Sequence, residues 1–273
     1  MSGITGRTKL LGLIADPVVA ARSPILANAS LARRGRESEY VLLALQVADG
    51  DLAPVVAGLR RIATFAGAIV SMPHKETVVP LLDELSPEAR LVGAVNVVRR
   101  EEGGRLVGTT LDGEGFVAGL RAAGHEVAGR RVLLCGAGGA GAAIAFALVK
   151  HGCTALAIEN RTRLRAEMLA ARLADGFPYA DVRVGVRPGD RWDVAVNATP
   201  LGMQDGDPLP MSDAMLDAAE LVADCVVTRD ATPLLEAARA RGRAVQPGRA
   251  MLEAQMELLL DFMGVGPGPT AFA

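Results

Sequence analysis

The chain is poor in aromatic residues and carries almost no net charge. Its 273 residues include one Trp, two Tyr and six Phe, against 31 glycines and a large aliphatic fraction. Few aromatics with much Ala, Val, Leu and Gly are typical of α/β packing, in which parallel strands are covered on both faces. A formal net charge of −2 gives no cationic surface for a polyanion, so we expect no nucleic-acid partner.

Cysteine is also scarce. Cys135, Cys153 and Cys225 are odd in number, scattered and without C-x-x-C spacing, so we expect neither a disulfide framework nor a metal site. That usage fits a reducing cytoplasm. Residues 1–6 contain no apolar h-region, so we expect no signal peptide. The length of the chain predicts two domains.

A glycine cluster follows an apolar run and precedes an Ala-rich stretch. The run at 132–135 has strand length, and the stretch at 142–150 has a helical composition. Gly136, Gly138 and Gly141 fit G-x-G-x-x-G. In that motif the first glycine allows a tight turn, the second lets the backbone approach a pyrophosphate, and the third lets helix pack on strand. The phosphates would bind the free N–H groups of the helix N-terminus.

Two other structures are alternatives for residues 132–150. Residues 132–149 carry no charge and are nearly long enough to span a bilayer, but four glycines interrupt them and no other segment resembles a span. We therefore expect no membrane helix. The second alternative is a buried core helix whose glycines serve packing only. A strand at 155–158 argues against it, because strand, helix and strand complete a β-α-β unit.

The residues after this second strand bear on the cofactor. In NAD enzymes an acidic residue here usually binds the ribose hydroxyls, and Glu159 fits that role. Arginines instead present a planar fork of donors to a dianionic phosphate. The residues expected to form such a pocket are Asn160, Arg161, Thr162 and Arg165, whereas Arg163 is expected on a solvated helix face. We therefore predict NADP, with NAD as the alternative.

Strands and helices alternate from the beginning of the chain. We expect strands at 10–15, 40–45, 67–71, 93–98 and 105–108, and helices at 23–34, 49–62 and 87–91. The predicted domains are 1–111, 112–248 for the dinucleotide, a helix at 249–264 that returns to the first domain, and a disordered tail at 265–273. Serine at an N-cap with proline at N1 is sufficient to explain Ser23-Pro24 as structure alone.

Three polar residues stand near strand ends of the first domain. Lys75 follows the strand at 67–71, and Pro73 suits a first helical turn, so we expect this lysine at a helix N-terminus, where the dipole repels it. A lysine that reaches solvent explains it equally well. Asn96 lies in an apolar run and needs backbone or ligand partners. Asp112 either caps a helix at 113–123 or serves a site at the hinge between the domains.

The second domain continues with strands at 181–186, 193–197, 221–227 and 244–246 and helices at 167–175 and 232–241. Strand carboxyl ends face the ligand crevice in a doubly wound sheet. Asn197 and Thr199, at one such end, are therefore candidates for the nicotinamide side of the site.

The order and spacing of these segments resemble the shikimate dehydrogenase family over nearly the whole chain. The matched segments are 23–24, 72–75, 93–96, 111–116, 136–140, 160–162, 197–203, 232–235 and 248–255. The resemblance implies an α/β protein with an amino-terminal substrate domain and a Rossmann-type doubly wound domain. It also implies a small alicyclic acid substrate and reversible hydride transfer between NADP and a ring carbinol, as in shikimate or quinate. A cytoplasmic monomer or homodimer is expected.

The resemblance also assigns roles by position. Lys75 and Asp112 become the catalytic pair, in which the lysine exchanges the carbinol proton. The substrate positions are Ser23, Ser71, Asn96, Thr110 and Gln255. The pyrophosphate positions are Gly136, Ala137, Gly138, Gly139 and Ala140, and the adenosine-phosphate positions are Asn160, Arg161, Thr162 and Arg165. The positions toward the nicotinamide are Asn197, Ala198, Thr199, Cys225 and Gly248.

Several substrate positions depart from the family pattern. Ala21 and Ile69 replace a serine and an asparagine, Ser71 replaces a threonine, Thr110-Leu111 replaces Asn-Thr, and Val227 replaces a tyrosine. We therefore expect retained chemistry on a ligand with fewer or differently presented hydroxyls than shikimate. Two other hypotheses are an NAD-dependent relative acting on an unrelated hydroxy acid and a dinucleotide-binding sensor without turnover. Retention of Lys75 and Asp112 speaks against the sensor.

Overall fold

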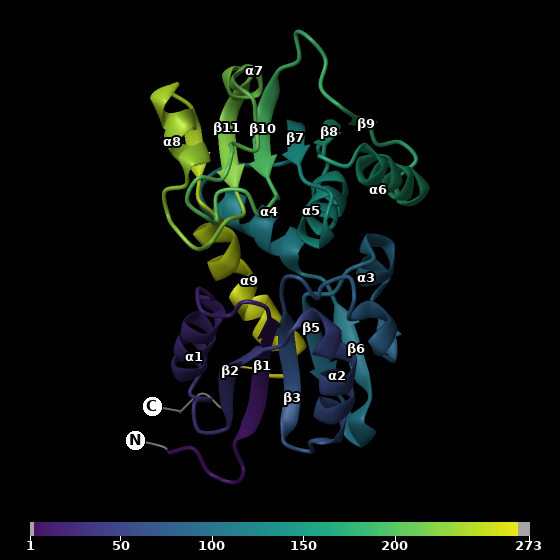
Figure 1. Ribbon diagram of the computed structural model, residues 1–273, viewed down its shortest axis with the longest axis vertical. Coiled ribbons are helices and arrows are strands. Elements are labelled where there is room, and N and C mark those ends of the chain that lie inside the picture. Colours follow the sequence, from purple (N-terminus) through teal and green to yellow (C-terminus); the bar gives the residue numbers. More distant parts are fainter. Residues whose placement is uncertain (1–2, 267–273) are drawn as a thin grey trace. The chain divides into compact units, whose positions relative to one another are not determined.

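The computed structural model describes residues 3–266, which separate into two compact units (Figure 1). The first unit comprises the chain up to Leu111 together with the residues from Met256 on, and the second is Asp112–Gln255. Each unit is built on a six-stranded sheet with helices, so the α/β class is confirmed. No helix within residues 3–266 is long and apolar enough to cross a membrane.

The sheet of the first unit has the strand order β2-β1-β3-β5-β6-β4. Its strands are β1 (Lys9–Ala15), β2 (Tyr40–Gln46), β3 (Phe65–Val70), β4 (Glu84–Leu85), β5 (Val97–Arg100) and β6 (Leu106–Thr109). Its helices are α1 (Ser23–Arg33), η1 (Asp49–Asp51), α2 (Leu52–Arg61), η2 (Val79–Leu81), α3 (Pro87–Val92) and η3 (Glu102–Gly104). β1, β2 and β3 are parallel, and β5 is antiparallel to β3 and β6. The carboxyl ends of β1, β3 and β6 therefore share one edge of the sheet.

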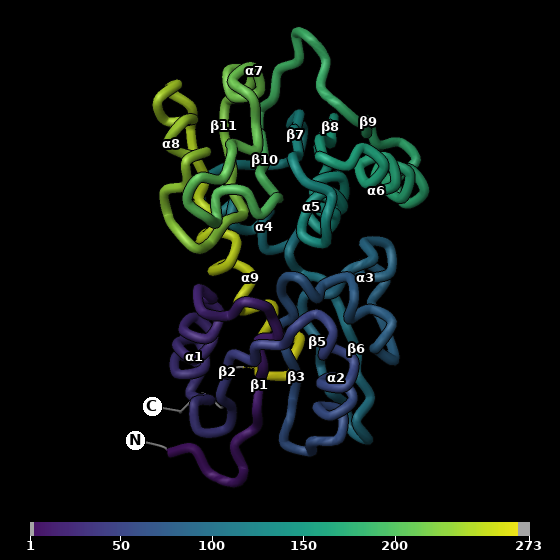
Figure 2. The backbone as a smooth tube through the Cα atoms, viewed as in Figure 1, coloured from purple at the N-terminus to yellow at the C-terminus, as the bar shows by residue number. Residues whose placement is uncertain are grey.

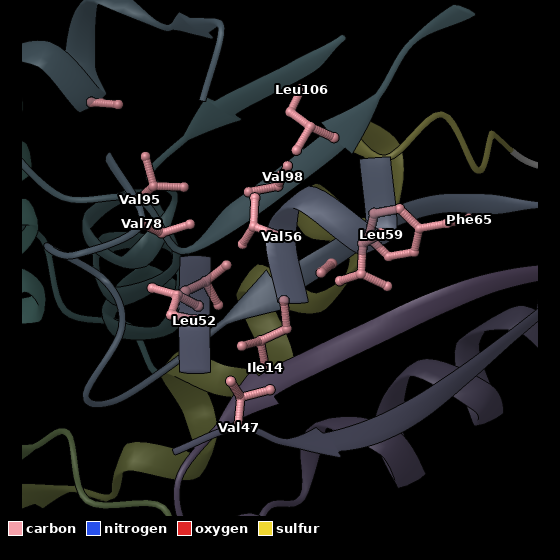
Figure 3. Close-up of a cluster of buried hydrophobic side chains, with 13 residues drawn as sticks. Ile14, Val47, Leu52, Val56, Leu59, Phe65, Val78, Val95, Val98 and Leu106 are labelled. Carbon is pink, nitrogen blue, oxygen red and sulfur yellow. The ribbon is translucent and has the colours of Figure 1, made fainter. Parts of the chain in front are cut away.

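Helix α2 is amphipathic and covers one face of this sheet. Leu52, Val56 and Leu59 recur at helical spacing and are all buried. They pack with sheet residues such as Ile14 and Val98 in the cluster drawn in Figure 3. At about 25 cal/mol per Å² of apolar surface, this contact is the main reason for the helix to dock.

Three local expectations for this unit are wrong. Ser23 does not cap α1, because Arg22 already has helical dihedral angles and occupies the N-cap position, where its side chain makes no capping hydrogen bond. Lys75 does not start an α-helix, since residues 72–78 form successive turns that lead into η2. The argument from the helix dipole therefore does not apply to it. Asn96 precedes β5 instead of lying inside the strand.

The sheet of the second unit is entirely parallel, in the order β12-β11-β10-β7-β8-β9. Its strands are β7 (Arg131–Cys135), β8 (Ala155–Glu159), β9 (Val182–Val184), β10 (Trp192–Asn197), β11 (Ala219–Asp224) and β12 (Ala244–Gln246). Its helices are α4 (Asp112–Ala122), α5 (Gly139–Lys150), α6 (Arg163–Gly176), α7 (Asp213–Asp217) and α8 (Pro233–Ala240). This is the doubly wound order, with the direction of winding reversed between β7 and β10.

The last helix, α9 (Gly248–Phe262), contributes residues to both units. Within the first unit, the nearly buried Arg34 of α1 binds its end. The Arg34 guanidinium donates to Glu257 (Nε to Oε2, 2.8 Å), to Asp261 and to the carbonyl oxygen of Val265. Val265 is fully buried, so the expected disorder from residue 265 on is wrong for this residue. Residues 267–273 of that predicted tail lie outside the described residues.

Glu257 is the carboxylate at the centre of this contact. Partial burial raises the pKa of Glu257, but hydrogen bonds from Ser30, Arg34 and Arg33 outweigh burial and hold the pKa below the ordinary value of 4.5. A carboxylate with a lowered folded-state pKa stabilises the protein above its unfolded pKa. That contribution is lost as the pH falls through the folded pKa.

We therefore predict a pH-dependent loss of stability for Glu257→Gln. At neutral pH the free energy of unfolding should fall by up to about 1 kcal/mol, because the carboxylate is nearly half exposed. This corresponds to roughly 2–4 °C in Tm. The gap to wild type should close as the pH falls below 4.5. Thermal unfolding at several pH values measures it, and Glu253→Gln, which removes an exposed partner of Arg249 on the same helix, is the control. A gap that persists unchanged into acid contradicts the assignment.

Candidate active site

Backbone hydrogen bonds at one sheet edge join the segments that carry four predicted residues of the first unit, Ser71, Lys75, Asn96 and Thr110. Ser71 follows β3, and Lys75 lies four residues further, half-buried within the turns. The Lys75 carbonyl accepts from the Val95 N–H (2.8 Å), and the Asn96 N–H donates to the Thr109 carbonyl (3.0 Å). These bonds bring the lysine turn, Asn96 and the end of β6 together.

Asn96 binds the segments on either side of it. Its carbonyl accepts from the Val70 N–H at the end of β3 (2.8 Å), and its side-chain Oδ1 accepts from the Leu111 N–H (2.8 Å). Asn96 is 2% exposed. Of the two kinds of partner expected for this buried amide, the backbone thus satisfies at least Oδ1.

His74 is a residue of this site that the sequence did not identify as important. Its side chain is fully buried, and Nε2 donates to the Val47 carbonyl after β2 (2.7 Å). It thereby ties the turns that carry Lys75 to the end of β2, which β1 separates from β3 in the sheet. A histidine directly before the lysine was the available indication, but only the fold reveals its partner.

The other substrate and catalytic candidates are divided between the units. Ser23 is buried in the first turn of α1, in the first unit. Asp112 is the first residue of α4 and Gln255 lies in α9, both buried in the second unit. Gln255 packs directly on Gly115 of α4, where a Cβ would lie 2.4 Å from the Gln255 Cβ. The predicted pair Lys75 and Asp112 therefore has one member in each unit.

In the second unit, the turn from β7 to α5 has the geometry that its glycines predict. Figure 2 traces this turn at the carboxyl end of β7. Gly136 has a φ of 115°, which L side chains rarely adopt. A Cβ on Gly141 would lie 2.2 Å from the Gly136 carbonyl oxygen, so this glycine is required for helix and strand to approach. A Cβ on Gly138 would meet nothing within 4 Å, so open space faces the backbone there.

Helix α5 begins at Gly139, three residues earlier than expected, with Gly138 at the N-cap. The first intrahelical bond runs from the Ala142 N–H to the Gly138 carbonyl (2.8 Å). The N–H groups of Gly139 and Ala140 therefore point out of the helix end, as the first turn of any helix requires. Together with the helix dipole they form a site suited to a diphosphate.

Asn160 holds this turn against the end of β8. Its Oδ1 accepts from the Ala137 N–H (3.1 Å), and its Nδ2 donates to the Thr162 carbonyl (2.8 Å). The side chain therefore shapes the loop. The ligand contact that the resemblance implies for Asn160 stays a prediction.

The arginines after Asn160 fall into two groups. Arg163 pairs with Glu167 one turn later (2.8 Å), as expected for a solvated helix face. Arg161 and Arg165 are exposed and have no ion-pair partner among the described residues. Glu159, the competing acidic residue, accepts from the Val186 N–H through Oε1 (3.0 Å). The guanidinium groups of Arg161 and Arg165 and the N-terminus of α5 thus face the solvent. Beside them, one carboxylate oxygen of Glu159 accepts a backbone hydrogen bond.

Asn197 is fully buried, and both ends of its amide are bonded. Nδ2 donates to the Leu201 carbonyl (3.1 Å) and to Asp224 Oδ1 (2.9 Å), while Oδ1 accepts from the N–H and hydroxyl of Thr199. Its role is to shape the loop that carries Ala198 and Thr199, both half-buried. The Cys225 N–H donates to the Asn197 carbonyl (2.9 Å), which places that cysteine beside the same loop.

Asp224 is the second residue that the sequence did not single out. It ends β11, is 1% exposed, and accepts from the Thr232 hydroxyl (2.6 Å). Burial raises the pKa of Asp224, and hydrogen bonds from Thr232, the Val226 N–H and Asn197 only partly offset that effect. An acidic residue that ends an apolar strand was the available indication. Gly248 lies close by, since a Cβ there would be 2.4 Å from the Val226 carbonyl oxygen.

Known proteins resemble this chain over both units. Residues 13–98 match a model described as the shikimate dehydrogenase substrate binding domain, and residues 120–199 match one described as shikimate / quinate 5-dehydrogenase. The shikimate dehydrogenase (NADP(+)) of Rubrobacter xylanophilus is 43% identical, over 97% of this chain and 94% of that protein.

Two solved structures have the same fold. Shikimate 5-dehydrogenase from Listeria monocytogenes, in complex with shikimate and NAD, is 33% identical with a TM-score of 0.83, over 97% of this chain and 95% of that one. The 5-ketofructose reductase of Gluconobacter sp. strain CHM43 is 30% identical with a TM-score of 0.82, over 98% and 96%.

The different surroundings of Gly138 and Gly141 predict different defects on substitution. Gly138→Ala should cost at most about 1 kcal/mol of stability, because its backbone angles suit alanine, but its methyl group would occupy the open space and weaken dinucleotide binding at least tenfold. Gly141→Ala should cost about 1–3 kcal/mol through overpacking. Thermal unfolding and fluorescence titration with NADPH separate the two. Unchanged binding by a folded Gly138→Ala variant would contradict the assignment of this turn.

Proposed function

Because the chain belongs to the shikimate dehydrogenase family, we propose that it catalyses reversible hydride transfer between NADP and the ring carbinol of a shikimate-like or quinate-like alicyclic hydroxy acid. The observation that carries this proposal is the 43% identity to an NADP-named shikimate dehydrogenase over nearly the whole chain. The retained Lys75 and Asp112 and the glycine turn at the end of β7 agree with it.

The residues of the second unit fit a dinucleotide with a 2′-phosphate. Gly138, Gly139 and Ala140 offer open space and N–H groups to the diphosphate, and Arg161 and Arg165 offer guanidinium donors to the additional phosphate. When bound, NADP supplies the hydride acceptor for oxidation of the carbinol. The partial engagement of Glu159 by the Val186 N–H favours NADP over NAD.

Within the first unit, Lys75 is the group for proton exchange. An ammonium at Nζ stabilises the oxygen of a carbonyl substrate and delivers a proton during reduction, and the neutral amine takes the proton back during oxidation. Asp112, in the second unit, is the other member of the proposed catalytic pair. Ser23, Ser71, Asn96, Thr110 and Gln255 form the set of substrate-binding candidates.

The substrate positions that differ from the family pattern bear on which acid the protein prefers. Ile69 is 5% exposed, so an aliphatic side chain replaces a buried polar one at the end of β3. Ala21 and Val227 are half-buried and likewise offer no hydrogen bond. Each unpaired ligand hydroxyl costs about 1–3 kcal/mol. We propose that the preferred acid presents fewer hydroxyls to these positions than shikimate does, and a panel that includes shikimate and quinate with NADP identifies it.

Arg161 and Arg165, which have no ion-pair partner among the described residues, and Arg163, which has one, allow a matched test of cofactor choice. Replacing both Arg161 and Arg165 by Ala should raise the Kd of NADPH roughly ten- to a hundredfold for each arginine, at about 1.5–3 kcal/mol per charged hydrogen bond. The Kd of NADH should hardly change. Arg163→Ala, which removes only the pair with Glu167, is the control. Fluorescence titrations with both nucleotides measure the effect, and equal weakening of both would refute the phosphate assignment.

Removing the lysine tests the chemistry. With the fastest acid of the panel, Lys75→Ala should lower kcat roughly a hundredfold or more, the usual contribution of a positioned acid-base group. The Kd of NADPH should stay unchanged. Lys9→Ala, an exposed lysine of the same unit, should retain full activity. If no acid of the panel changes the nicotinamide absorbance with the wild type, the proposed function fails. If Lys75→Ala keeps full activity, only the mechanism does.

A further inference from the structure

Thr110 carries a buried side-chain hydroxyl without a protein partner. The residue is 7% exposed, and its Oγ1 has no hydrogen bond to any described residue. A hydroxyl taken from water without a new partner costs about 1–3 kcal/mol in protein mutational data. Buried polar groups are hydrogen-bonded in the large majority of cases, so an exception calls for a specific explanation.

The position of Thr110 in the site supplies that explanation. It directly follows β6, whose carboxyl end shares a sheet edge with that of β3. The segment is bonded on both sides to Asn96, through the Thr109 carbonyl and the Leu111 N–H. The same web of bonds reaches Lys75 through the Val95 N–H. Thr110 is thus held in place by the residues that frame the reacting lysine.

The neighbouring threonine shows that an internal partner is available to a hydroxyl on this segment. Thr109 is 6% exposed, nearly the same as Thr110, but its Oγ1 lies 2.7 Å from the Ser86 hydroxyl, which caps α3. Two adjacent threonines of equal burial therefore differ in one respect. The Thr109 hydroxyl has a hydrogen-bond partner within the fold, and the Thr110 hydroxyl has none among the described residues.

We propose that Thr110 is a specificity-determining residue whose hydroxyl hydrogen-bonds a polar group, a hydroxyl or carbonyl oxygen, of the bound hydroxy acid. The proposal rests on the proposed function and deepens it by assigning the substrate a polar group at this position. Leu111, the next residue, and Ile69 near the end of β3 offer only aliphatic side chains, so Thr110 provides hydrogen bonding where these two positions provide none. An acid that lacks the matching group leaves the hydroxyl unpaired and is rejected.

Thr110→Val tests this because it removes the hydroxyl and keeps the shape. In the apoprotein the change should leave Tm unchanged or raise it, since it relieves an unpaired buried group. With the fastest acid of the panel and saturating NADP, kcat/KM should fall about tenfold or more, and the Kd of NADPH should stay unchanged. Thr110→Ser, which keeps the hydroxyl, should retain most of the activity.

Thr109→Val is the matched control and should show the opposite behaviour. It leaves the Ser86 hydroxyl without its partner, so Tm should fall by roughly 2–4 °C for each kcal/mol lost, while kcat/KM stays near wild type. Two results would overturn the proposal. One is wild-type kcat/KM in Thr110→Val. The other is a fall in its Tm like that of Thr109→Val, which would reveal an internal partner.

These outcomes are distinct from failure of the proposed function. If the wild type oxidises no acid of the panel, the proposed function falls. The apoprotein unfolding curves, together with the Tm shift that each acid produces in wild type and Thr110→Val, then decide the role of Thr110 alone. An acid that stabilises both proteins equally counts against a bond to this hydroxyl, and one that stabilises only the wild type supports it.

Discussion

Asparagine side chains bonded to backbone groups hold loops at the ends of strands in both units. Beyond a strand end the backbone has no ladder partner, yet a buried N–H or carbonyl group must still be satisfied. Asn96 meets this need after β6, Asn160 in the glycine turn, and Asn197 in the loop after β10. Each amide supplies an acceptor, a donor or both at a place where no strand can. The loops are thereby fixed before any ligand arrives, as a catalytic site requires.

This arrangement distinguishes polar side chains that are bonded within the fold from polar side chains that are not. Asn160 and Asn197 bond to loop backbone at both ends of their amides, so they stabilise the loops that carry them. Arg161 and Arg165 carry charges that no described carboxylate neutralises, and Thr110 carries a hydroxyl without a partner. A polar group without a hydrogen-bond or ion-pair partner among the described residues is a stronger candidate for ligand binding than residue type alone would make it.

The sequence predicted those features that depend on local chemistry. The alternation of strands and helices, the conformational roles of Gly136 and Gly141, and the ion pair of Arg163 on its helix face all follow from spacing over a few residues. The sequence could not predict the roles of His74 and Asp224 or the pairing of Thr109 with Ser86, because their partners are far away along the chain. His74 binds a carbonyl 27 residues away, Asp224 binds side chains 8 and 27 residues away, and Ser86 is 23 residues from Thr109. The error at Lys75 has the same origin. Proline at a suitable position indicates a helix start, but the turns after β3 bond to neighbouring loops instead of propagating.

The path of α9 has a consequence for how the protein folds and can be divided. The chain leaves the first unit after Leu111 and re-enters it at Met256, so this unit is discontinuous in sequence. Met263 lies against Gly67 of β3, where a Cβ would come within 3.0 Å of it, and Leu259, Leu260 and Val265 are buried. During translation, the residues that complete the core of the first unit are therefore made only after the whole second unit. The core of the first unit therefore stays incomplete until synthesis ends. A gene fragment ending at Leu111 would encode the sheet of this unit without the residues from Met256 on that pack against it.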